Sequence, residues 1–159
     1  QAALHLFEPV PRLAKRIAEL ARLNGLEGRW RIEPAAVDTS SGERTLFTTR
    51  TQLGASLLRE KAVEVGLKRG IQVRTVALAD YCRDHRIEAF DVVKLDAEGH
   101  ELPILQAALP MIATARLIYV RVFPPRSTRE AIAVCLTPYG FEEIAGEHPE
   151  AAEVLFVRR

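Results

Sequence analysis

An ionisable cluster directly follows an apolar run in the segment DVVKLDAEGHELPIL, residues 91–105. Asp96 and Glu98 supply carboxylates and His100 supplies an imidazole, which are groups that can orient a hydroxyl or accept its proton. If the chain stays extended, the two-residue period of a strand puts Lys94, Asp96 and Glu98 on one face. A lysine in a buried strand is costly without an anionic partner, so we expect Lys94 to meet one of these two acids.

The same cluster also has a purely structural interpretation. Asp96 could cap the following helix, while Glu98 and Glu101 lie at the positive end of its dipole. This interpretation explains one or two acids, but it does not explain the lysine, the glycine and the histidine together. Gly99 would let the backbone turn sharply or approach a ligand closely. His100 is a minor candidate, because a lone histidine is more often a surface residue than a catalyst.

A further acid, Glu8, follows the apolar run of residues 3–7. A carboxylate at the end of a strand can accept hydrogen bonds from the two hydroxyls of a ribose. An acid near a helix N-terminus also stabilises the helix by about 0.3–1 kcal/mol through the dipole alone. These considerations leave the binding role and the structural role of Glu8 equally open.

Hydrophobic periodicity predicts the elements that must position these residues. The predicted strands are 3–7, 29–37, 90–96 and 115–123, followed by two strands within 141–159. The predicted helices begin at Pro11, Ala77, His100 and Ser127, and the first of them stops at Asn24-Gly25. Pro34 should lie near the end of its strand or at a bulge.

Residues 39–76 are predicted to form a hairpin or loop insertion. A polar turn at Ser41-Gly42 leads into a strand, and 70–76 is its expected partner, with a loop and a short helix between them. Elsewhere strands and helices alternate, which indicates one α/β domain over residues 1–159. Its sheet should be mostly parallel with an antiparallel C-terminal edge, and ligands should bind beyond the carboxyl ends of its strands.

Composition excludes several classes of protein. With 48% apolar and 27% charged residues in a chain of 159, the sequence is typical of one soluble globular domain. A net charge of +1 does not suit a nucleic-acid-binding protein, which would need a basic stripe. No apolar stretch is long enough to span a membrane. The two cysteines, Cys82 and Cys135, lack neighbours at metal-ligand spacing, so we expect no metal site and two reduced thiols in a cytoplasmic protein.

At this point the motifs resemble a known family. The segment KLDAEGHELPIL, preceded by LFEP and AAVDTSSGERTLF and followed by PYGF, is similar to the FkbM-type family of S-adenosylmethionine-dependent methyltransferases. The match runs in order through nearly the whole chain, and its strongest part is residues 94–101, which resemble the family's K-x-D-x-E-G-x-E signature. The resemblance implies a Rossmann-like methyltransferase core and methyl transfer to a hydroxyl of a small molecule, glycan or lipid.

The resemblance also implies roles for individual residues. Glu8, in FEP, is expected to hold the ribose of S-adenosylmethionine, while Ala36 and Asp38, in AAVD, belong to the segment that lies along the adenine. The segment GASL, residues 54–57, resembles a small-residue loop of the family. Asp96 is the first candidate to position or deprotonate the acceptor, and Glu98 is the second.

Two departures from the family pattern bear on activity. The first strand and the glycine-rich turn of this fold are not recognisable, because the ribose-binding acid is already residue 8 and no G-x-G occurs. We therefore expect an N-terminally truncated core, with a gap or a direct pairing between the strands that end at Glu8 and Asp96, and weak or absent cofactor binding. The second departure is Arg121, which stands where the family more often has an acid and needs an anionic partner such as Asp96 or Glu98.

Two other functions remain open at this point. One is a non-catalytic, truncated or degenerate methyltransferase-like domain, which the missing glycine-rich segment favours. The other is a fragment of an NAD-dependent oxidoreductase, because an acid after a strand also suits that cofactor. The K-x-D-x-E-G-x-E cluster and the antiparallel end favour the methyltransferase over the oxidoreductase.

Overall fold

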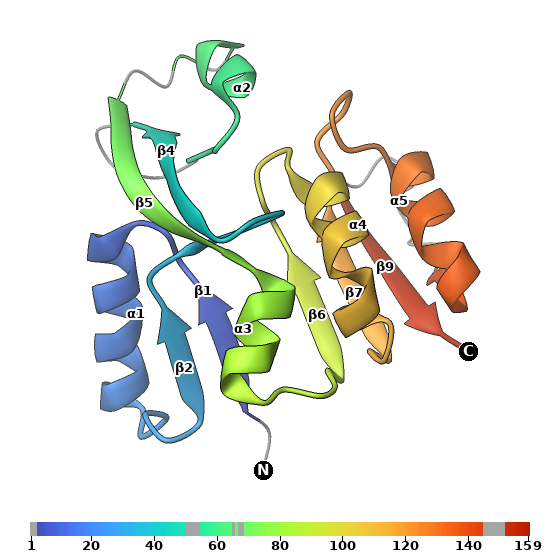
Figure 1. The fold of residues 1–159 in the computed structure, drawn as a ribbon, viewed down its shortest axis with the longest axis horizontal. Coiled ribbons are helices and arrows are strands. Elements are labelled where there is room, and N and C mark those ends of the chain that lie inside the picture. The colour runs from blue at the N-terminus through green and yellow to red at the C-terminus, as the bar shows by residue number, and fades with distance from the viewer. Residues whose placement is uncertain (1–2, 50–54, 65, 67–68, 145–151) are drawn as a thin grey trace.

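The computed structural model describes residues 3–49, 55–64, 66, 69–144 and 152–159 of the chain. These residues form three β-sheets with helices packed against them (Figure 1). The α/β class predicted from the sequence is confirmed.

The first sheet has two parallel strands joined by a helix, β1 (Leu4–Phe7), α1 (Pro11–Leu23) and β2 (Trp30–Glu33). Pro11 begins α1, because the fixed φ of proline suits the first helical position, and Asn24 follows its end. β2 stops directly before Pro34, which has no N–H to continue the ladder. The prediction of one strand over 29–37 is therefore wrong, since the chain continues after Pro34 as a strand of another sheet.

The second sheet has the order β3-β5-β4, formed by β3 (Ala36–Asp38), β4 (Gly42–Thr48) and β5 (Arg69–Ala77). β4 and β5 pair antiparallel from Gly42 opposite Thr75 to Thr48 opposite Arg69, so the predicted pairing of these two strands is confirmed. The short helix α2 (Arg59–Glu64) lies between them in the sequence. β3 pairs parallel with β5, and α3 (Leu78–His85) follows β5 directly.

The third sheet has the order β6-β7-β9-β8, formed by β6 (Val92–Leu95), β7 (Leu117–Arg121), β8 (Phe141–Ile144) and β9 (Glu153–Arg158). Its helices are α4 (Glu101–Ile112) and α5 (Arg129–Leu136), and the 3-10 turn η1 (Thr137–Tyr139) follows α5. Thr128 caps α5 by accepting a 3.2 Å hydrogen bond from Ala131 N, one residue after the predicted helix start at Ser127. α4 contains Pro110 in its last turn and stops at Ile112.

The strand directions are more evenly mixed than predicted. In the described sheets three pairs are parallel (β1 with β2, β3 with β5, β6 with β7) and three are antiparallel (β4 with β5, β7 with β9, β8 with β9). The antiparallel C-terminal edge is confirmed, but a single, mostly parallel sheet is not. β1 and β6 run in the same direction in Figure 1, yet they belong to different sheets and do not pair with each other.

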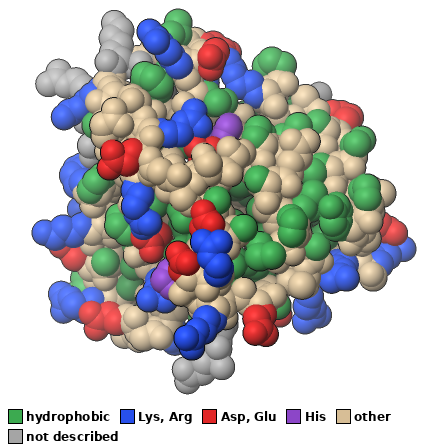
Figure 2. All heavy atoms as spheres, in the orientation of Figure 1, with side chains coloured by type: hydrophobic (Ala, Val, Ile, Leu, Met, Phe, Trp, Pro, Cys, Tyr) green, Lys and Arg blue, Asp and Glu red, His purple; other side chains and the backbone are tan. Residues whose placement is uncertain are grey.

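The largest apolar core lies in the third sheet and its two helices. Leu105 of α4, Ile118 of β7, Ile132 of α5, Phe141 of β8 and Phe156 of β9 are almost completely buried in it. Figure 2 shows further hydrophobic side chains gathered on the outer face over α4 and α5. Of the described helices, none combines the length and the apolar character that crossing a bilayer requires.

Candidate active site

A cavity of about 640 Å³ lies between β1 and β6. All four residues of each strand line it, together with residues of α4, β3 and β4. Among the described strands, each of the two has a hydrogen-bonded neighbour on one side only. Glu8, Asp96, Glu98 and His100 line the cavity at the carboxyl ends of β1 and β6, as the rule for parallel strands predicts.

Glu8 stands at the end of β1. Its backbone N–H donates to Glu33 O at 3.0 Å, and its Oε1 accepts a 2.8 Å hydrogen bond from Val10 N. Burial raises the pKa of Glu8, while the hydrogen bond from Val10 acts in the opposite direction. The described residues offer no partner to Oε2, so this oxygen can accept a hydrogen bond from a ligand.

Ala36 and Val37 of β3 line the cavity, whereas Asp38 lies behind them with its side chain fully buried. Oδ1 of Asp38 accepts from Thr39 N at 2.7 Å and lies 2.9 Å from Nε2 of His100, and Oδ2 accepts from Arg44 at 2.7 Å. Burial by itself raises the pKa of Asp38, but the three hydrogen bonds together outweigh it and hold the pKa below its ordinary value. Asp38 is therefore a buried carboxylate whose oxygens are already occupied.

Asp96 follows β6 and is exposed at the cavity. Its Oδ2 lies 3.4 Å from a guanidinium nitrogen of Arg121, and this guanidinium also lies 5.1 Å from the ring centroid of Phe123. The expectation that Arg121 pairs with Asp96 or Glu98 is thus confirmed for Asp96. Because the pair is long and both side chains are partly exposed, we expect it to contribute little to stability.

Glu98 is held from two directions. Its side chain forms an ion pair with Lys61 of α2, and its backbone oxygen accepts from Ser56 Oγ at 3.1 Å. The φ of Glu98 is +53°, a left-handed conformation that is uncommon for a residue with a side chain. Nζ of Lys61 lies 3.9 Å from the ring centroid of Phe123, which anchors this ion pair further.

Glu101 organises the loop that carries these groups. Its side chain is completely buried, and its carboxylate accepts from the N–H groups of Ala97, at 2.9 Å, and Gly99, at 3.0 Å to Oε1 and 3.1 Å to Oε2. Gly99 has a φ of +101°, which favours glycine. The interpretation of Asp96 as a helix cap is wrong, because α4 begins at Glu101 with His100 at the N-cap position.

Lys94 differs from its prediction. In the described part of the chain it forms no ion pair with Asp96 or Glu98, and its Nζ lies 5.8 Å from the ring centroid of Tyr119. The reason is that one edge of β6 has no neighbouring strand in the part of the chain that the structure describes, so Lys94 is exposed to water and needs no anionic partner.

The pairing of His100 with Asp38 was not predicted. The two residues are 62 positions apart, and only the packing of α4 beside β3 brings them together, so their spacing in the sequence carries no signal. In the segment expected to form a small-residue loop, Ala55, Ser56 and Leu57 line the cavity, and Gly54 lies outside the described residues. Among the described residues, no three His, Cys, Asp or Glu side chains come together as metal ligands would.

The acids at the ends of β1 and β6 lie around one cavity, where ligands bind in open α/β folds. The chain matches the model of the methyltransferase FkbM domain over residues 2–154, and it therefore belongs to this family. A search of curated proteins found no match.

A solved structure supports the fold. The crystal structure of methyltransferase FkbM from Methylobacillus flagellatus KT is similar with a TM-score of 0.62 and 13% sequence identity. The similarity covers 98% of this chain but only 36% of that one. At this identity the likeness shows the fold alone.

Proposed function

We propose that this chain forms part of an S-adenosylmethionine-dependent methyltransferase that acts on a hydroxyl of a small molecule, glycan or lipid. The observation that carries the proposal is that Glu8 and Asp96, at the ends of β1 and β6, line one cavity in a domain of the FkbM family. When bound, the cofactor supplies a methyl group on a sulfonium, and this group bonds to the acceptor oxygen as the bond from carbon to sulfur breaks.

The cavity has properties that fit the cofactor. Its volume is within the range of about 300–1,000 Å³ that is usual for small-molecule sites. Oε2 of Glu8 can accept hydrogen bonds from a ribose, and the small side chain of Ala36 leaves room for a flat base beside β3. We propose that Asp38, whose oxygens are occupied, fixes the end of β3 rather than touching the cofactor.

The acids at the end of β6 suit the acceptor side. The long contact between Asp96 and Arg121 leaves Asp96 able to accept a hydrogen bond from an acceptor hydroxyl and to hold it in line for transfer. Glu98 is the second candidate, because its ion pair with Lys61 holds it more firmly.

Two substitutions distinguish the binding of S-adenosylmethionine from the transfer of its methyl group. We expect Glu8→Gln to weaken S-adenosylmethionine binding by about 10-fold or more, because it removes a charge-assisted hydrogen bond worth about 1.5–3 kcal/mol. Asp96→Asn should instead lower the rate of transfer far more than the affinity for the cofactor. Binding is measured by titration, and transfer by the release of S-adenosylhomocysteine with a panel of sugars, glycolipids and small alcohols.

The control is Glu19→Gln on the exposed face of α1, which should change neither quantity. Equal losses of binding and transfer in Asp96→Asn would contradict its role at the acceptor. We expect the affinity of the chain to be weaker than micromolar, because the cavity lies open between β1 and β6, two strands that do not pair with each other.

A non-catalytic domain is the second candidate function. It is favoured by Arg121 and Lys61, which pair with the two proposed acceptor-side carboxylates. In that case the titration would show no binding of S-adenosylmethionine and the panel would release no S-adenosylhomocysteine. The match to the FkbM family favours either of these functions over an NAD-dependent oxidoreductase.

A further inference from the structure

The contact between Asp38 and His100 fixes which nitrogen of His100 carries the hydrogen. The Asp38 carboxylate is buried and accepts from Thr39 and Arg44, so it is present in its ionised form. An ionised carboxylate can only accept, so Nε2 of His100, at 2.9 Å, must donate its hydrogen to Oδ1. In neutral His100 the Nδ1 atom therefore has a lone pair.

The side chain of His100 is also accessible from the cavity. The side chain is 12% exposed and lines the cavity with Glu8 and Asp96. The residues that the structure describes provide no hydrogen-bond partner for Nδ1. The site thus contains a basic nitrogen whose ring is held in place by a buried acid on another element.

We propose that His100 is the general base that accepts the proton of the acceptor hydroxyl, with Asp38 as its positioning residue. This inference rests on the proposed function, because it concerns the acceptor of the same cavity. As the acceptor oxygen gains the methyl group, its proton moves to Nδ1. The resulting imidazolium is stabilised by Asp38 at Nε2, and the proton then passes to water.

The neighbouring charges favour His100 over the two acids for this step. Asp96 would have to abandon Arg121 to take up a proton, and Glu98 would have to abandon Lys61. Protonation of His100 instead places a positive charge beside Asp38. Arg44, on the far side of Asp38, and Lys61 oppose this charge, whereas Glu98 and the buried Glu101 favour it.

Nitrogen NMR of the histidine rings tests the proposal without cofactor or acceptor. Two-bond ¹H–¹⁵N spectra of the labelled chain, recorded over a series of pH values, should show the neutral ring of His100 with its hydrogen on Nε2 and none on Nδ1. In Asp38→Asn this preference should weaken, because an amide can donate as well as accept. A neutral His100 with its hydrogen on Nδ1 would overturn the proposal.

Steady-state kinetics give a second test, once the panel of sugars, glycolipids and small alcohols has identified an acceptor. His100→Gln keeps a donor for Asp38 but lacks the basic nitrogen, so it should lower kcat by about 10²–10⁴-fold and remove the acidic limb of the pH profile. Asp38→Asn should lower kcat on the order of 10²-fold. In His100→Gln the affinity for S-adenosylmethionine should stay within about twofold, as expected for a group that acts on the proton of the acceptor.

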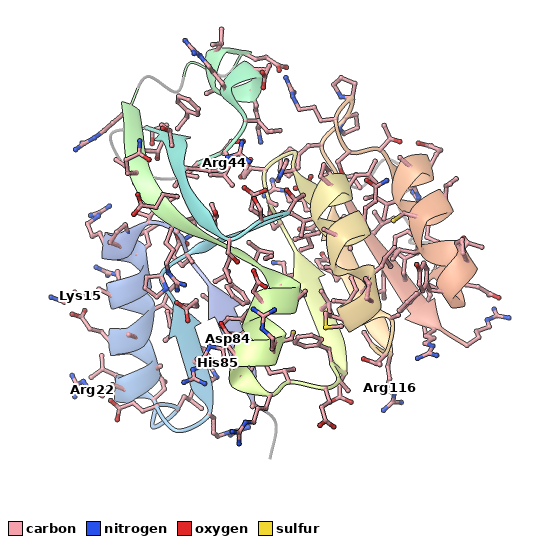
Figure 3. The ribbon with its side chains drawn as sticks, viewed as in Figure 1. Lys15, Arg22, Arg44, Asp84, His85 and Arg116 are labelled. Carbon is pink, nitrogen blue, oxygen red and sulfur yellow. The ribbon has the colours of Figure 1, made fainter. Side chains whose placement is uncertain are left out.

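The matched control is His85→Gln, at the end of α3, because Figure 3 shows His85 well away from Arg44, the partner of Asp38. It should leave kcat and the pH profile unchanged. If His100→Gln keeps the wild-type kcat, the proposal is wrong while the proposed function stands. If S-adenosylmethionine does not bind to the wild type, the proposed function fails, and the nitrogen spectra still decide the state of His100.

Discussion

Asp38 shows at the scale of one residue how a buried charge is made stable. Its side chain has no exposure to water, yet the hydrogen bonds from Thr39, Arg44 and His100 keep it ionised. Figure 3 shows Arg44 between the β4–β5 pair and the loop after β6, which is where Asp38 accepts from it. A carboxylate held in this way should stabilise the fold only while it remains charged.

The lowered pKa of Asp38 predicts a pH dependence of stability. A carboxyl group whose pKa is lower in the folded state stabilises the protein above its unfolded value, which is near 3.8, and this contribution is lost as the pH falls toward the folded value. Between about pH 5 and pH 3 the wild type should therefore lose more unfolding free energy than Asp38→Asn does. Denaturant titrations at each pH measure the difference.

Asp84→Asn is the control for this prediction, because Asp84 is an exposed residue of α3 (Figure 3). The free energy of unfolding of Asp84→Asn should change with pH in the same way as that of the wild type. Parallel stability curves for the wild type and Asp38→Asn would show that the buried carboxylate does not contribute as described.

The candidate site residues could be predicted from the sequence, but most of their hydrogen-bond partners could not. Residue types and strand ends located Glu8, Asp96 and Glu98 at one cavity, and the need of Arg121 for an anion was met by Asp96. The pairing of His100 with Asp38 depends on how α4 packs beside β3, which no local pattern encodes.

At the scale of elements, the important feature is the pair of free strand edges on either side of the cavity. In a parallel ladder, alternate residues direct their backbone groups to the same neighbour. Leu4 N donates to Arg29 O, and Glu8 N donates to Glu33 O. The backbone N–H and C=O groups of His5 and Phe7, which lie between them, therefore point away from β2.

The same alternation applies to β6. Asp91 O accepts from the start of β7, so Val92 and Lys94 direct their groups away from that strand. Val92 is 61% exposed, which is unusual for an apolar residue in a predicted buried strand. One edge of β1 and one edge of β6 therefore face the cavity with unpaired backbone groups.

These edges predict a pattern of hydrogen exchange. The amides of His5, Phe7, Val92 and Lys94 should exchange faster than those of Leu6 and Val93, which face a paired strand. The residues within each strand serve as controls for one another, because they share the same local stability. If the edge amides and the amides of Leu6 and Val93 were equally protected from exchange, the strand edges would be paired in solution.

The prediction of elements failed mainly where pairing is nonlocal. Local chemistry placed the start of α1 at Pro11 and the start of the last helix close to Thr128, because these effects act within a few residues. The assignment of the strands to three sheets, in which β1 and β6 do not pair with each other, depends on contacts between distant segments.

The whole molecule has several apolar clusters instead of one continuous core. The cluster of the third sheet is the largest, and smaller ones surround Val10 with Leu46 and Ala35 with Tyr81. One contiguous core is the usual arrangement for a domain. The cavity between β1 and β6 lies where these parts meet, so ligand binding there would join the first and third sheets.

The cavity between β1 and β6 is therefore where we expect S-adenosylmethionine to bind. The most direct test is to titrate the ¹⁵N-labelled chain with S-adenosylmethionine and to follow the backbone amide signals, because NMR also detects weak binding. We expect saturable shifts grouped around Glu8 and Asp96, at the ends of β1 and β6, and around Ala36, at the start of β3. These shifts should be greatly reduced in Glu8→Gln. Saturable shifts confined to another surface, or no shifts at all, would contradict the assignment of this cavity as the methyltransferase site.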